Sequence, residues 1–137
     1  MSMFKIFDTA ATGMSAQNLR LNLVSSNLAN AHSVSSSVTD TYRARHPVFS
    51  ALLNELNPAD PAVGVKMLGV VENDAPLHPE YAPDHPMANE EGMIYRSNVN
   101  IAEEMANMIS ASRTYQSNVE VVNSAKQLLS ATLRMGQ

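Results

Sequence analysis

The 137-residue sequence has no cysteine and no tryptophan, and only 16% of its residues are charged. The absence of cysteine excludes a disulfide framework, a thiolate-bound zinc and a cysteine nucleophile. Aromatic residues make up 5% of the chain, so a core must be built from aliphatic side chains and the nine methionines. The net charge of −4 argues against nucleic-acid binding, which needs a basic surface to neutralise phosphates. The length is enough for a single domain.

Long apolar runs are also missing. No stretch approaches the roughly 20 apolar residues of a transmembrane helix. The first eight residues, MSMFKIFD, lack the uninterrupted apolar core of about 7–15 residues that a secretory signal needs. If the protein leaves the cytoplasm, we therefore expect it to use another route.

All seven prolines lie between residues 47 and 86, and the two ends of the chain contain none. Because proline interrupts helices, this distribution predicts two long helices, at about residues 4–30 and 101–134, joined by an irregular middle. Asn100 followed by Glu103 indicates an N-cap for the second helix. We thus expect three segments: an N-terminal helix at 1–31, an irregular and partly β middle at 32–99, and a C-terminal helix at 100–137.

Both predicted helices carry apolar residues in alternating steps of three and four, the spacing at which one helix packs against another. We therefore predict that the two helices pair as an antiparallel coiled coil, which gives a mainly α fold with only a small β element. Residues 1–30 contain only three charged side chains, Lys5, Asp8 and Arg20, and the remaining faces of this helix are otherwise small and uncharged, which favours packing against further chains. The predicted helix seam and assembly interface comprises Phe4, Phe7, Ala11, Met14, Leu21, Leu28, Ile101, Met105, Met108, Tyr115, Val119, Val122, Leu129 and Leu133. The alternative is a globular three- or four-helix bundle whose additional helices come from the middle segment.

The middle segment carries weaker signals. Residues 63–72 are the best strand candidate, with a possible bulge at their glycines. Residues 42–46 are predicted to be a short extended piece, and residues 49–56 one or two helical turns. Residues 73–91 hold four prolines and five acidic residues without lysine or arginine. Together with Glu72, we expect this acidic stretch to lie on the surface and to contact basic residues of neighbouring chains.

No motif in the chain indicates catalysis. His78, Glu80, Asp84 and His85 could in principle bind a metal, but their spacing matches no known ligand pattern and prolines separate them. Solvated loop histidines are the simpler interpretation. The sequence contains no nucleophile elbow and no glycine-rich phosphate loop. We therefore predict no catalytic, cofactor-binding or metal site.

The two ends of the chain resemble bacterial flagellar rod and hook proteins. The N-terminal resemblance lies in residues 16–22 (AQNLRLN) and 26–31 (SNLANA). Residues 81–89 (YAPDHPMAN) are similar to the segment that precedes the last helix of a rod protein, and residues 111–118 (ASRTYQSN) to that helix itself. Ser97 and Met93 depart from the pattern, which usually has a proline and an aromatic residue there. The chain is thereby identified as a member of the flagellar basal-body rod family.

This resemblance implies a structural subunit of the proximal rod, exported by the flagellar type III route and polymerised into a shaft that crosses the periplasm. Such a shaft transmits torque and encloses an export channel. The implied partners are copies of the chain, other rod subunits, and adaptor and export-apparatus proteins of the basal body, without nucleic acid, a cofactor or a membrane span.

Two other classes of function stay open at this point. The first is a soluble helical binding module such as an export chaperone, which would purify as a compact dimer. The second, a weaker alternative, is an enzyme that uses the loop histidines; metal analysis of the purified protein would test it.

Overall fold

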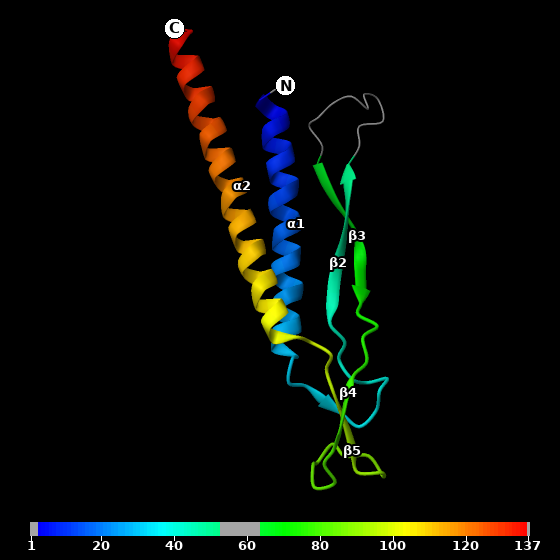
Figure 1. Cartoon of the computed structure of the whole chain (residues 1–137). Helices are drawn as coiled ribbons and strands as arrows, with labels where there is room; N and C mark the ends of the chain where they lie inside the picture. The colour runs from blue at the N-terminus through cyan, green and yellow to red at the C-terminus, as the bar shows by residue number, and fades with distance from the viewer. Residues whose placement is uncertain (1–2, 53–63, 137) are drawn as a thin grey trace.

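The computed structural model describes residues 3–52 and 64–136, which form two long helices, a two-stranded ribbon and a three-stranded sheet (Figure 1). Helix α1 (Met3–Ala29) and helix α2 (Ile101–Met135) lie side by side and run in opposite directions. The ribbon packs on α1 from the other side, and the three-stranded sheet lies at the end of the molecule away from both termini. Helix α1 is therefore the middle layer of the structure.

The prediction of a mainly α fold, an antiparallel coiled coil with only a small β element, is wrong. Of the described residues, 50% are helical and 22% lie in antiparallel strands. The ribbon pairs β2 (Arg45–Leu52) with β3 (Gly64–Glu72). Proline does not prevent these strands because each strand of a ribbon has a free edge, where a missing backbone N–H breaks no pairing. Pro47 accordingly lies within β2, opposite Val70.

The predictions for the middle segment had mixed outcomes. The strand predicted at residues 63–72 is confirmed by β3, although residue 63 lies outside the described residues. The bulge is also confirmed, because the pairing shifts between Val48 and Phe49 and leaves Leu68 without a partner. The extended piece at 42–46 continues through Pro47 into β2. The helical turns predicted at 49–56 are wrong for residues 49–52, which belong to β2; the others lie outside the described residues.

The start of α2 is fixed by the cap that the sequence predicts. The Asn100 side-chain oxygen accepts hydrogen bonds from the backbone amides of Ala102 and Glu103, at 3.1 and 3.4 Å. The carboxylates of Glu103 and Glu104 lie in the first turn, where they favour the positive end of the helix dipole. The helix then runs for 35 residues, about 50 Å, without proline or glycine.

The three-stranded sheet is built from short strands in the order β1 (Val34–Ser35), β5 (Met93–Arg96), β4 (His78–Tyr81), all antiparallel. Ile94 of the central strand β5 is among the largest fully buried side chains of the described residues. Pro79 lies in the edge strand β4, where it again interrupts no central pairing.

Two of the six acidic side chains in residues 72–91 are paired with arginine. Glu72 forms an ion pair with Arg45 across the ribbon, and Glu80 forms one with Arg96 across β4 and β5. The other four acidic side chains, Asp74, Asp84, Glu90 and Glu91, are exposed. Their contact with basic residues of other chains stays a prediction.

The interior of the molecule is small. Its hydrophobic cluster consists of Ala31, Ala44 and Val99, with Tyr42 packed against it. The helices bury mainly small side chains against each other and the ribbon, namely Ala10, Ala16, Val24, Ala111 and Ala125. Many large apolar side chains stay exposed instead, including Phe4 at 72% and Leu68 and Leu133 at 65%. A single copy of the chain therefore buries only part of its apolar surface.

Gly92 gives a direct test of the turn before β5. Its φ is +74°, and a Cβ placed there would lie 2.9 Å from the Tyr81 ring. We expect Gly92→Ala to destabilise the purified protein by about 1–3 kcal/mol, because it adds backbone strain and a close contact. Gly69→Ala is the matched control, since nothing lies within 4 Å of its Cβ position, and it should leave the melting temperature nearly unchanged. Equal melting temperatures for the two variants would contradict the described turn.

Candidate assembly interface

In the structure, His78, Glu80, Asp84 and His85 are not grouped as metal ligands would be. His78 is exposed in β4, and His85 uses Nδ1 to accept a hydrogen bond from the Met87 amide at 3.1 Å. Glu80 is paired with Arg96, and Asp84 is exposed. Among residues 3–52 and 64–136, no three histidine, aspartate or glutamate side chains are grouped so that they could hold a metal ion. Neither helix of this part of the chain is both long and apolar enough to span a membrane.

The contacts between α1 and α2 recur every seven residues along α1. The Asn27 amide donates to Glu104, and the Arg20 guanidinium donates to Asn107. A Cβ at Gly13 would lie 3.0 Å from the Asn118 side chain. Ile6 shares an apolar groove with Ala125 and Leu128 near the outer end of the helix pair, which is the end where both chain termini lie. The partners on α2 do not keep this seven-residue spacing, and several of the contacts are polar.

The predicted seam residues of α1 lie beside these contacts. Four of them follow the contacting residues by one position and are half-buried: Phe7, Met14, Leu21 and Leu28. Phe4 and Ala11 are exposed.

The predicted seam residues of α2 divide in a similar way. Those that are half-buried are Met108, Tyr115, Val119, Val122 and Leu129, whereas Ile101, Met105 and Leu133 are exposed. The structure therefore brings part of the set together within one chain and leaves the rest on the surface. Their role in assembly stays a prediction.

Asn27 joins α1, α2 and β2 at the inner end of the helix pair, which is the end away from the chain termini. This side chain is fully buried, and its amide nitrogen donates to the Arg45 carbonyl at 2.9 Å and to Glu104 Oε2 at 3.0 Å. Its oxygen accepts from the Tyr42 hydroxyl at 2.8 Å and from the Arg45 amide at 2.9 Å. All four hydrogen-bonding positions of the side chain are thus filled. Asn27 fixes α1 to α2 and to the start of β2.

Asn98 makes a similar connection just before α2. Its oxygen accepts from the Ala44 amide at 2.8 Å, and its nitrogen donates to the carbonyls of Asn73 and Ala75. The segments that enter β2, leave β3 and enter α2 are therefore held together. The two asparagines set the position of the ribbon relative to the helices.

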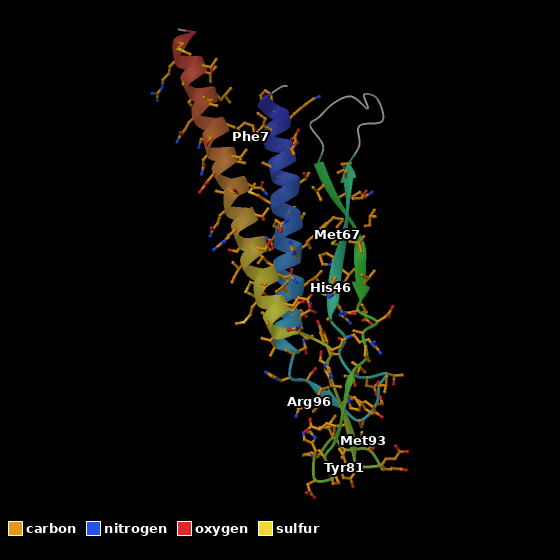
Figure 2. The ribbon with its side chains drawn as sticks, viewed as in Figure 1. Phe7, His46, Met67, Tyr81, Met93 and Arg96 are labelled. Carbon is orange, nitrogen blue, oxygen red and sulfur yellow. The ribbon has the colours of Figure 1, made fainter. Side chains whose placement is uncertain are left out.

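The fold presents two different surfaces that contain apolar side chains. The ribbon exposes Val48, Met67, Leu68, Val70 and Val71, and α2 exposes Met105, Ile109, Val121, Leu128 and Leu133. Figure 2 shows Met67 on the ribbon and Phe7 near the outer end of α1. Exposed apolar surface of this extent is typical of proteins that function in contact with other chains.

The comparisons with known proteins agree with an assembly role. Residues 7–34 match the family described as flagella basal body rod protein, and residues 90–135 match the flagellar basal body rod FlgEFG protein C-terminal family. The chain is 41% identical to the flagellar basal-body rod protein FlgC of Salmonella typhimurium, and the similarity covers 100% of both chains. The chain belongs to the flagellar basal-body rod proteins.

Two further relatives show the same relationship. The FlgC rod protein of Yersinia enterocolitica is also 41% identical over 100% of both chains. That of Borreliella burgdorferi is 31% identical, with 100% of this chain and 99% of the relative covered. The chain is thus a structural rod subunit, a component of the flagellar basal body and not an enzyme, as the sequence resemblance predicts. The matched segments include most of α1 and α2. The residues of the ribbon lie between these two segments in the sequence.

Sequence reasoning assigned no role to the polar residues of the rod subunit's helix contact. Asn27 and Glu104 lie inside the two segments that match the family models, but apolar periodicity carries no signal for them. The available signal was the seven-residue spacing of Ile6, Gly13, Arg20 and Asn27.

Asn27→Ala tests the central hydrogen-bond network of the rod subunit. The change leaves the Arg45 backbone and the Glu104 carboxylate without buried partners, so we expect a loss of about 2–4 kcal/mol in the free energy of unfolding. Asn123→Ala on the exposed side of α2 is the control and should change it by less than about 0.5 kcal/mol. Urea denaturation of the purified chains measures both. A similar small change in the two variants would show that the network contributes little.

Proposed function

We propose that this rod subunit forms part of the proximal rod and polymerises into a periplasm-spanning shaft that transmits torque and surrounds an export channel. The observation that carries this proposal is the exposure of predicted seam residues in the single chain. Ile101 is 37% exposed and Met105 is 55% exposed. Contacts with further subunits would remove these side chains from water, with a gain of roughly 25 cal/mol per Å² of apolar area.

The layer order of the fold supports an open-ended assembly. Helix α1 lies between α2 and the β2–β3 ribbon, so the two outer layers present different surfaces. Contacts between unlike surfaces of identical chains are heterologous, and they generate a helical array unless the rotation closes a ring. A shaft can be built in this way from one repeated contact.

The partners that follow are other copies of the chain and other rod subunits, whose helix pairs would continue the same packing. Adaptor and export-apparatus proteins of the basal body would contact the ends of such a shaft. The small side chains along α1 support close packing of this kind, because they permit neighbouring backbones to approach.

Met105→Asp tests the proposed assembly surface without disturbing the fold. Because Met105 is exposed in the single chain, we expect the free energy of unfolding to change by less than about 0.5 kcal/mol. In the shaft, however, the new carboxylate would be buried without a partner at every copy of the subunit. We therefore expect the variant to be synthesised and exported normally but to leave cells non-motile, with few completed rods in basal-body preparations.

The matched control is Gln116→Asp, which adds the same charge at an exposed polar position of α2. His78→Ala and His85→Ala should also be mild, because no chemistry depends on either imidazole. Normal rod numbers in the Met105 variant would contradict the assembly role of this face. Loss of motility in a histidine variant with intact stability would favour a site-based function instead.

A further inference from the structure

An apolar groove lies along the contact of the two helices, near the chain termini. It has a volume of about 410 Å³ and runs between Ile6 of α1 and one side of α2. Its apolar α2 residues are Val121, Ala125 and Leu128. Val121 is 47% exposed and Leu128 is 62% exposed. The groove therefore continues the seam between α1 and α2 and presents apolar surface to water.

One of the residues that line this groove is charged. Glu120 lies beside Ser117 and Ser124 at its polar side. The Glu120 side chain is exposed and has no hydrogen-bond or ion-pair partner among residues 3–52 and 64–136. A carboxylate at the rim of an apolar groove favours a partner that brings a cation together with apolar side chains.

Strand β3 of the ribbon offers this combination. Lys66, Met67 and Leu68 are consecutive and exposed, and Leu68 is the bulge residue without a partner in β2. The Lys66 ammonium has no partner in the described part of the chain either. The charges at the other end of the ribbon, Arg45 and Glu72, are already paired with each other. We call residues 66–68 the β3 knob.

The β3 knob and the α2 side of the groove cannot meet within one chain. Helix α1 lies between the ribbon and α2, so the two surfaces are on opposite sides of the molecule (Figure 1). A contact between them must join two copies.

The accessible surface of the chain is large enough for such contacts. It amounts to 9285 Å². A compact monomer of 137 residues exposes roughly 7,000 Å², so the excess is about 2,300 Å². Each partner of a standard protein–protein interface contributes about 800 Å². The excess therefore suffices for a copy to use its ribbon and its groove in two separate interfaces.

We propose that the β3 knob of one copy inserts into the apolar groove of a second copy, where Lys66 pairs with Glu120. This inference rests on the proposed function, because it names the faces through which copies of the subunit join. The interface buries Met67 and Leu68 against Val121 and Leu128. The contact is heterologous, so the knob of the second copy stays free for a third copy and the same contact repeats along the assembly.

The absence of native cysteine permits a direct test by disulfide formation. A disulfide requires the Cα atoms of its two cysteines to lie within about 7 Å. We expect a chain with Leu68→Cys and Val121→Cys, expressed in place of the parent chain, to form a ladder of disulfide-linked multimers when isolated rods are oxidised. Because α1 separates the two positions within one chain, each bond joins two copies. Electron micrographs of the same preparations give the number of completed rods.

The matched control combines Leu68→Cys with Asn123→Cys. Asn123 is exposed on the same helix, but its side chain points about 200° around the axis from that of Val121. This control should give no ladder. A second test pair, Met67→Cys with Leu128→Cys, samples the same contact at different positions and should give one.

Charge reversal in the Leu68→Cys, Val121→Cys chain tests the ion pair. Lys66→Glu and Glu120→Lys each place like charges together at the interface, so we expect each to lower the cross-link yield about tenfold. The double reversal restores opposite charges and should recover most of the yield. Both residues are exposed in the single chain, so urea unfolding of the purified variants should match that of the parent.

Failure of this inference is distinguishable from failure of the proposed function. No ladder from either test pair overturns the inference, as does an equal ladder from the Asn123 control or a double reversal that cross-links no better than the single ones. A thiol at position 121 that rods protect from maleimide without linking it to position 68 shows a different occupant, which also overturns it. Completed rods in those cells leave the proposed function intact, whereas absence of the parent chain from isolated rods contradicts the proposed function itself.

Discussion

The fold depends on the hydrogen bonds of one buried amide. Asn27 places two donors and two acceptors at the point where α1, α2 and β2 meet, and each has a partner. A buried polar group with all its partners holds neighbouring elements in one relative position, whereas an apolar side chain would permit several. Because the surrounding core is composed mainly of alanines, this network supplies much of the specificity that large apolar side chains supply elsewhere. The orientation of the β2–β3 ribbon relative to the helices follows from these hydrogen bonds.

The small core and the exposed apolar surface have a common cause. Alanines at the helix contact bring α1 and α2 close together but bury little area per residue. The larger apolar side chains are left for surfaces that other subunits can cover. We expect a rod protein built in this way to be stabilised by its neighbours, because burial of apolar surface would drive both its folding and its assembly.

The helices and one strand could be predicted from the sequence because their signals are local. The absence of proline from both ends, the Asn100 cap and the pattern of residues 63–72 each depend on neighbouring residues alone. Strand β2 could not be recognised, because Pro47 suggests a break unless the free edge of the ribbon is known. The contact through Asn27 and Glu104 joins residues far apart in the sequence, and apolar periodicity carries no information about it. The family resemblance supplied the function without that geometry.

The bulge in β3 affects how the chain behaves before it is incorporated into a rod. An exposed apolar strand with a free edge can recruit strands from other molecules and start disordered aggregation. The unpaired Leu68 interrupts the regular alternation of backbone donors and acceptors along that edge. An incoming strand therefore loses register at this residue and can pair only over the short runs on either side of it. The bulge therefore hinders edge-to-edge pairing with strands of other molecules, while the exposed apolar side chains of the ribbon stay available for contact with rod subunits.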